Sequence, residues 1–276
     1  MENQSQPDGY LVQPFGSSSS FEIATWNIEQ FPKSGQNTVT TLTRLIKNFD
    51  IDLIAFQEIN SQEYFKCLLD SLPQYEGFCS LYPEDNMKLG LVYKQDMISI
   101  SNITQLFIND TYNFPRPPLY AYIRIKFNDV VAFDFSLINL HLKAYHDTTS
   151  IMKRKHAITA LKEVIDTRLF TSRDHDIIIL GDWNDELSDN EKENIFLPFL
   201  QDSLNYSFLI PEGDVQISYP AWQSRIDHIL ISNDVKFEYK NGTIQILQPD
   251  KEFEDYFNII SDHRPLAAKF YIFEER

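Results

Sequence analysis

The sequence predicts an α/β (α+β) fold in which two mixed β-sheets pack together and helices flank them. Strand and helix patterns alternate along the chain without a long linker or an internal repeat, which favours one domain. A hairpin pattern in the middle of the chain requires antiparallel strands and disfavours a doubly wound parallel sheet. Several strands are apolar at both odd and even positions, as expected of strands covered on both faces. With 276 residues, 43% of them hydrophobic, the chain can fill such a core.

Each predicted element rests on a local pattern. The first two strands, at 21–28 and 51–57, are apolar runs, and amphipathic helices follow them at 38–49 and 61–72. Ser61 is a suitable N-cap for the second helix. Aromatic and β-branched runs predict three strands between 77 and 107. The remaining predicted elements are a hairpin of strands 120–127 and 130–140, a helix at 149–169, and strands at 176–180, 227–231 and 266–272.

Residues 1–20 are polar and include four consecutive serines, so we expect a flexible tail before a single domain at 21–276. The segment has no basic start and no apolar stretch of the signal-peptide kind, which favours a cytoplasmic location; a secreted chain that had lost its signal peptide would look the same. No run reaches the ~18 apolar residues that span a bilayer, so we expect no stable membrane insertion. No protein partner is indicated, and we expect a monomer.

The net charge of the chain limits the classes of function that it can have. Twenty-four Lys and Arg residues against 40 Asp and Glu residues give a formal net charge of −16. A chain of this charge is not held on nucleic acid or anionic membrane by bulk attraction. An enzyme that meets phosphate groups through bound cations is compatible with it, because the metal supplies the local positive charge.

Polar residues follow apolar strand faces at the strand ends. In the strand at 130–140 the odd positions are apolar up to Leu137 and then become Asn139 and His141. By strand alternation, Asn27 follows Ile23, Glu58 follows Ile54 and Phe56, and Asp182 follows Ile178 and Leu180. Asp227 and the pair Asp262-His263 stand before the last two strands. If those strands run antiparallel to the others, all six positions meet at one rim.

Each of these positions alone has a structural explanation. Asn27 could close a turn, Glu58 could cap a helix, and residues 182–185 could form an Asx-rich turn. Six such positions together are harder to explain, because burying amides, carboxylates and imidazoles costs several kcal/mol unless they are paired or bind a metal. The oxygen donors of Asn27, Glu58 and Asp262 suit Mg²⁺ or Mn²⁺ better than zinc.

Six short motifs occur in one order across residues 21–272. They are Trp26-Asn27-Ile28, Gln57-Glu58, Asn139-Leu140-His141-Leu142, Gly181-Asp182-Trp183-Asn184, Arg225-Ile226-Asp227 and Ser261-Asp262-His263. The series resembles that of the endonuclease/exonuclease/phosphatase superfamily, which includes DNase I, exonuclease III-type endonucleases, inositol polyphosphate 5-phosphatases and neutral sphingomyelinases. The resemblance implies a DNase I-like four-layer α/β sandwich.

The resemblance also implies site roles. Glu58 would be the principal Mg²⁺ (or Mn²⁺) ligand, with Asn27 near the metal and Asp262 as a further candidate ligand. Asp182 would orient or deprotonate the attacking water, and its setting after four apolar residues could raise its pKa. The other implied roles are phosphate contact by His141 and His263, help from Asn184 in holding water and phosphate, and pairing of Asp227 with His263. Arg116 resembles the family's phosphate-contacting arginine; a solvent-exposed Arg in a Pro-rich loop is the alternative.

Several interpretations stay open at this level. Tyr219 and Trp222 could stack on a base or sugar, or simply pack. The basic run 153–155 could track a nucleic-acid backbone, or form a solvated helix face. The leading hypothesis is a Mg²⁺-dependent endo- or exonuclease acting on DNA. The alternatives are a phosphatase or phosphodiesterase of inositol phosphates, phospholipid headgroups or small nucleotides, and a non-catalytic binding module.

Overall fold

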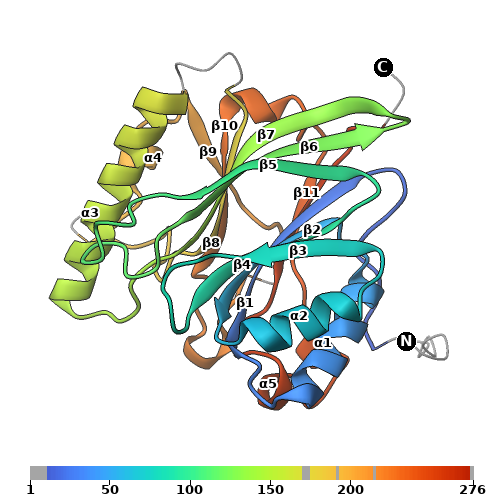
Figure 1. Cartoon of the computed structure of the whole chain (residues 1–276). Coiled ribbons are helices and arrows are strands. Elements are labelled where there is room, and N and C mark those ends of the chain that lie inside the picture. The colour runs from blue at the N-terminus through green and yellow to red at the C-terminus, as the bar shows by residue number, and fades with distance from the viewer. Residues whose placement is uncertain (1–10, 170–174, 191–192, 214–215, 274–276) are drawn as a thin grey trace.

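Two six-stranded β-sheets form the centre of the computed structural model, which describes residues 11–169, 175–190, 193–213 and 216–273 (Figure 1). The first sheet has the order β11-β12-β1-β2-β4-β3 and the second β5-β6-β7-β8-β10-β9. The first contains β1 (Phe21–Phe31), β2 (Leu53–Ile59), β3 (Tyr75–Cys79), β4 (Lys88–Lys94), β11 (Thr243–Ile246) and β12 (Leu266–Phe270). The second contains β5 (Ile98–Gln105), β6 (Leu119–Phe127), β7 (Val130–His141), β8 (Ile177–Asp182), β9 (Tyr206–Leu209) and β10 (Asp227–Ser232).

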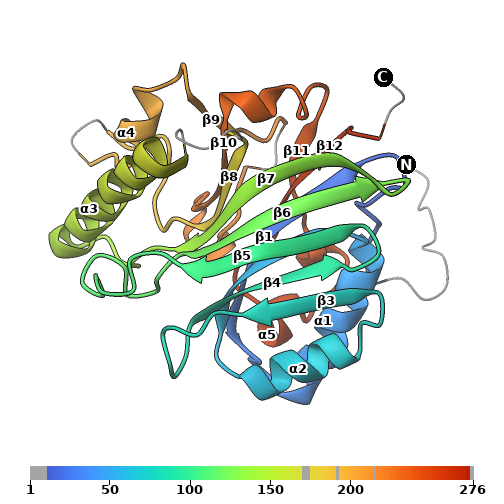
Figure 2. The same cartoon turned by 45° about the horizontal axis from the view of Figure 1, so that its top comes forward.

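Helices cover the outer face of each sheet (Figures 1 and 2). The first sheet is covered by α1 (Gln36–Phe49), α2 (Gln62–Asp70) and α5 (Tyr256–Ile259), and the second by α3 (Thr148–Val164) and α4 (Leu197–Leu200). Helix α1 forms because its apolar residues recur on one face, where Leu42, Leu45 and Phe49 join the core beneath the sheet. The order helix, sheet, sheet, helix is the expected four-layer α/β sandwich.

An apolar core lies between the two sheets, in addition to the cores beneath the helices on either side. Strand residues of alternate parity enter it, such as Ile23 and Ala268 from the first sheet and Phe135, Leu180 and Ile229 from the second. The intervening residues of the same strands pack under the helices instead, which explains why these strands are apolar at both parities.

Strand directions bring the predicted polar positions to one rim. Strand β1 runs parallel to β2, and β7 runs parallel to β8. Strands β12 and β10 run antiparallel to β1 and β8, respectively. One end of the sandwich therefore contains the carboxyl ends of β1, β2, β7 and β8 and the amino ends of β10 and β12, as expected.

Other elements differ in detail from the sequence expectation. The helix expected at 149–169 is α3 followed by a π-helical turn, η1 (Ile165–Leu169). The four-residue edge strands β9 and β11 were not expected, because an alternating pattern is too short to detect there. Short 3₁₀ helices occur at η2 (Pro220–Trp222), η3 (Asn233–Lys236) and η4 (Pro249–Lys251).

The expected free tail is wrong for residues 11–20, which pack on the domain. Val12 is fully buried and Phe15 nearly so, both in the core beneath α1. The backbone N–H of Phe15 donates to the carbonyl of Phe49 at 3.0 Å, and that of Leu11 donates to Asn48 Oδ1 at 2.7 Å. Val12, Phe15 and the partly buried Leu11 supply the apolar contact. Residues 1–10 lie outside the described residues.

Among the described residues, no helix has both the length and the apolar character needed to cross a membrane.

Candidate active site

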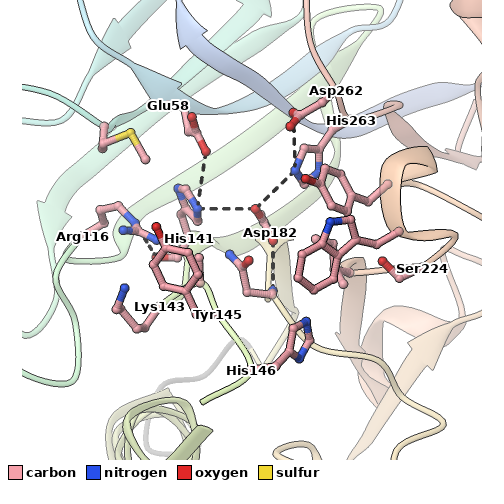
Figure 3. A pocket seen from close by; sticks show the side chains of 16 residues that line it. Glu58, Arg116, His141, Lys143, Tyr145, His146, Asp182, Ser224, Asp262 and His263 are labelled. Carbon is pink, nitrogen blue, oxygen red and sulfur yellow. Dashed lines mark hydrogen bonds and ion pairs between the residues drawn. The ribbon is translucent and has the colours of Figure 1, made fainter. Parts of the chain in front are cut away.

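A cavity of about 290 Å³ opens at the rim where the two sheets meet (Figure 3). Seven of the residues singled out from the sequence line it: Glu58, Arg116, His141, Asp182, Asn184, Asp262 and His263. The other two, Asn27 and Asp227, lie directly behind and hydrogen-bond to lining residues. The structure therefore brings all nine together, from both sheets.

Asp182, at the end of β8, is the centre of the site. Its Oδ2 accepts a hydrogen bond from Asn27 Nδ2 at 3.0 Å, and its Oδ1 accepts one from the backbone N–H of Asn184 at 2.9 Å. The imidazoles of His141 and His263 bring their Nε2 atoms to 3.4 and 3.8 Å from Oδ2 (Figure 3). Burial raises the pKa of Asp182 to about 7; His263 opposes this shift, and Asp227 and Glu58 add to it. A carboxylate with this pKa suits proton transfer near neutral pH.

His263 is held as a cation. Its Nδ1 lies 2.9 Å from Asp227 Oδ2, and its ring packs 4.8 Å from that of Tyr219. Burial by itself disfavours the charged ring, but the charge and hydrogen bond of Asp227, together with Asp182, raise the pKa of His263 to about 10. At neutral pH, His263 Nε2 is a charged donor that faces the cavity.

His141 is held in the opposite protonation state. Burial lowers its pKa well below the usual value, and Arg116 and His263 lower it further. Its Nδ1 is buried and, among the described residues, has no hydrogen-bond partner. Asp182 is thus flanked by one neutral and one charged imidazole, which donate differently to a phosphate oxygen.

Glu58 reaches the site by a different route from the one that alternation predicts. Ile54 and Phe56 face the helices, so strict alternation would turn Glu58 away from the cavity. The pairing of β2 with both neighbours is irregular between Phe56 and Ile59, and Glu58 has a φ of 67°. This bulge in left-handed conformation redirects the carboxylate, which accepts hydrogen bonds from Asn27 Nδ2 and the Gln30 N–H, both at 3.0 Å.

Gln57, not Glu58, continues the face between the sheets. Its Nε2 donates to Asn139 Oδ1 at 2.8 Å, which joins β2 of one sheet to β7 of the other. Asn139 Nδ2 in turn donates to the carbonyl of Phe56 at 3.0 Å. These buried amides therefore bind the sheets to each other below the cavity.

The donor set fits a hard divalent cation. Glu58, Asp182 and Asp262 present three carboxylates to one cavity. Burial raises the pKa of Asp262; His263 opposes that shift, and Glu29 and Glu58 add to it, so the site carries carboxylate repulsion that a cation would relieve. Asp182, Asp227 and His263 also offer atoms within 4.8 Å of one another, but the His263–Asp227 hydrogen bond occupies that imidazole. Glu58, Asp262 and Asn27 are therefore the residues whose oxygen atoms could hold such a cation.

Arg116 and Asn184 are fixed by the chain that follows β7. Arg116 Nε donates to the carbonyl of His141 at 3.1 Å, and Nη2 donates to that of Leu142 at 2.5 Å. Asn184, with a φ of 54°, donates from Nδ2 to the same Leu142 carbonyl at 3.2 Å. Arg116 is half-buried and lines the cavity. Burial lowers the pKa of its guanidinium, while the negative charges of Asp182 and Glu58 oppose that shift.

Aromatic residues form the outer part of the cavity. Tyr219 and Trp222 line it, and Trp222 stacks on His146 with ring centres 5.3 Å apart. Lys143 Nζ lies 4.3 Å from the centre of the Tyr145 ring. No pattern in the sequence predicts a role for Tyr145 or His146, although both follow His141 closely.

In the basic run 153–155, the interpretation as a solvated helix face is wrong for the middle residue, whereas Lys153 and Lys155 are partly exposed. Arg154 has no exposed surface, and its Nε lies 2.9 Å from Asp185 Oδ2. Arg154 is buried because Asp185, which is distant in sequence, lies beside it in the fold.

A comparison of the sequence with known families decides the identity. The sequence profile of the Endonuclease/Exonuclease/phosphatase family matches residues 24–263. The chain belongs to this family. Members of the endonuclease/exonuclease/phosphatase family are hydrolases of phosphate esters, and the chain is an enzyme of that class. No curated protein sequence matches the chain.

Solved structures share the fold at low sequence identity. The human Nocturnin catalytic domain with bound sulfate is 17% identical and has a TM-score of 0.65, covering 91% of this chain and 94% of that one. A mannosyl-6-phosphatase from Bacteroides thetaiotaomicron is 14% identical with a TM-score of 0.64, covering 90% and 98%. TDP2 of D. rerio, in complex with a single-strand DNA product, is 15% identical with a TM-score of 0.61, covering 92% and 99%.

Proposed function

We propose that the protein is a Mg²⁺-dependent phosphodiester hydrolase that acts on DNA as an endo- or exonuclease. The observation that supports this proposal best is the position of Asp182, between a neutral His141 and a charged His263 in a cavity lined by carboxylates. The similarity to TDP2 of D. rerio in complex with a single-strand DNA product agrees with a nucleic-acid substrate.

The side chains support in-line attack by water. Asp182 would take the proton of the attacking water, which Asn184 Nδ2 and the Asp182 carboxylate can orient. His263, as a cation, and His141, as a neutral donor, would stabilise the non-bridging oxygens as negative charge builds up. Arg116 would bind the same phosphate. Mg²⁺ held by Glu58, with Asn27 and Asp262, would neutralise phosphate charge and assist the leaving oxygen.

A second substrate class has a specific observation in its favour. Arg154 of the densest basic run is buried on Asp185, so that run offers fewer charges to a nucleic-acid backbone than its sequence suggests. A cavity of about 290 Å³ is close to the lower limit for a small-molecule site. The alternative substrates are therefore inositol phosphates, phospholipid headgroups or small nucleotides, and the similar fold of a mannosyl-6-phosphatase agrees with this class.

The first experiment is a hydrolysis panel with Mg²⁺, Mn²⁺ or EDTA. Its substrates are supercoiled DNA, an abasic-site duplex, single-stranded RNA, an inositol polyphosphate and bis-p-nitrophenyl phosphate, with Glu58→Ala as the inactive control. EDTA-sensitive nicking that is lost in Glu58→Ala supports the nuclease proposal. Turnover of a small ester without nicking supports the alternative, and no metal-dependent turnover of any substrate contradicts both.

Salt dependence separates the two classes further. Cleavage of long DNA should decrease steeply as salt is raised if several phosphates are bound, whereas hydrolysis of a small ester should change little. A monomeric state and a cytoplasmic location complete the proposal; light scattering of the purified protein and cell fractionation test them.

A further inference from the structure

One buried arginine connects the two loops that build the site. Arg154, on the first half of α3, donates from Nη1 to the carbonyls of Lys143 and Tyr145 at 2.8 and 2.7 Å. Its Nε donates to Asp185 Oδ2 at 2.9 Å. The guanidinium therefore joins the segment after β7 to the segment after β8, and it does so without any exposed surface.

Both connected segments carry residues of the cavity. Lys143, Tyr145 and His146 line it from the segment after β7, which we call the rim segment (residues 142–147). Asp185 directly follows Asn184 and lies three residues after Asp182. A second contact, from Asn184 Nδ2 to the Leu142 carbonyl, joins the same two segments on the cavity side.

The backbone of the rim segment is strained at Tyr145, whose carbonyl bonds this arginine. Tyr145 has a φ of 82°, which an L-residue adopts only when its surroundings hold it. The two carbonyls flanking Ala144 both point to Arg154 Nη1. A lysine could pair with Asp185, but its donors are all on one nitrogen, whereas Arg154 bonds the acid through Nε and the two carbonyls through Nη1.

We propose that Arg154 is a positioning residue for substrate binding, which holds the rim segment so that Lys143, Tyr145 and His146 contact the substrate beside Asp182. This inference rests on the proposed function, because that function places the substrate in the cavity. Arg154 itself does not touch the reacting groups. Its effect is on the position of the rim segment, and hence on KM more than on kcat.

The test compares Arg154→Lys and Arg154→Met with Lys155→Met, which removes a positive charge from the next position of the same helix. Amide hydrogen exchange of residues 142–147 is measured first, with β7 residues 136–140 as the internal reference. We expect faster exchange in the rim segment of both Arg154 variants and unchanged exchange in Lys155→Met. If Arg154→Met does not fold, Arg154→Lys keeps the buried charge and carries the test.

Kinetics on the best substrate of the panel provide the second measurement. We expect Arg154→Lys to raise KM about tenfold while kcat changes less than about threefold. Exchange and KM equal to those of Lys155→Met would overturn the inference, and so would a decrease in kcat at unchanged KM. If the wild type hydrolyses nothing, the proposed function fails, and the exchange data still decide whether Arg154 positions the rim segment.

Discussion

Asp227 on β10 and Asp182 on β8 are directly paired across the antiparallel ladder of the second sheet. Two carboxylates at paired positions repel each other, and both are almost fully buried. The charged His263 compensates, because it bonds Asp227 through Nδ1 and faces Asp182 with Nε2.

Replacing Asp182 with Asn should remove the proton acceptor while keeping the size of the side chain and one of its two acceptor oxygens, so one of the hydrogen bonds from Asn27 Nδ2 and the Asn184 N–H is lost. We expect kcat to decrease by about 10³-fold, within the range for loss of a general base, with little loss of stability. Steady-state hydrolysis and a urea melt check this prediction. The exposed Asp96→Asn is the matched control; a variant of Asp182 that keeps wild-type kcat would exclude the base role.

Replacing Asp227 with Asn should lower the pKa of His263, because burial alone disfavours the imidazolium. In the wild type, kcat/KM should rise near pH 7 as Asp182 loses its proton and fall near pH 10 as His263 loses its own. The protonated ring acts only below its pKa, so the alkaline limb should move to lower pH in the variant.

The His263 ring shifts in an NMR titration measure this pKa directly. Asp234→Asn, which changes the carboxylate 3.5 Å from His175, is the control and should leave His263 unaffected. An alkaline limb at the same pH in wild type and Asp227→Asn would contradict the assignment.

Mg²⁺ should stabilise the protein even in the absence of substrate, because it relieves repulsion among the cavity carboxylates. At about ten times its Kd, we expect an increase in Tm of about 3 °C. The increase should be lost in Glu58→Gln and kept in Glu63→Gln, which changes an exposed glutamate of α2. Scanning calorimetry measures Tm with and without Mg²⁺. An equal increase in Tm in both variants would mean that the ion binds elsewhere.

Val12 should contribute to the stability of the domain although it lies in the segment expected to be a tail. Val12→Ser should lower the free energy of unfolding by about 2 kcal/mol, because it replaces a fully buried apolar side chain with a polar one. The exposed neighbour in Gln13→Ser should have almost no effect. Urea denaturation of both variants decides, and equal midpoints would mean that the segment does not pack in solution.

Strand alternation predicted much of the site, but not all of it. Asn27, His141 and Asp182 follow the face between the sheets, so their convergence was readable from the sequence. Glu58 was placed in the site for the wrong reason: its register assumed a regular strand, and the bulge at Phe56–Ile59 reverses the side-chain direction. A bulge of one extra residue cannot be detected from the hydrophobic pattern of a strand.

Other features depend on partners distant in sequence. Arg154 looks like part of a solvated basic run until Asp185 is brought beside it. Leu11, Val12 and Phe15 are three apolar residues in a short segment, too few for a periodic signal. The motif order identified the family and the sandwich, whereas the rim segment and the edge strands β9 and β11 required the structure.

The amide pair Gln57–Asn139 has a consequence for how this enzyme can diversify. It fixes the lateral offset of one sheet on the other, and the two halves of the site belong to different sheets. Substitutions in the core between the sheets must therefore conserve the total side-chain volume. Otherwise a substitution far from the bound phosphate would shift one half of the site relative to the other and slow hydrolysis before the chain unfolds. Adaptation to new substrates should accumulate in the surface loops around the cavity, while the interlayer evolves slowly.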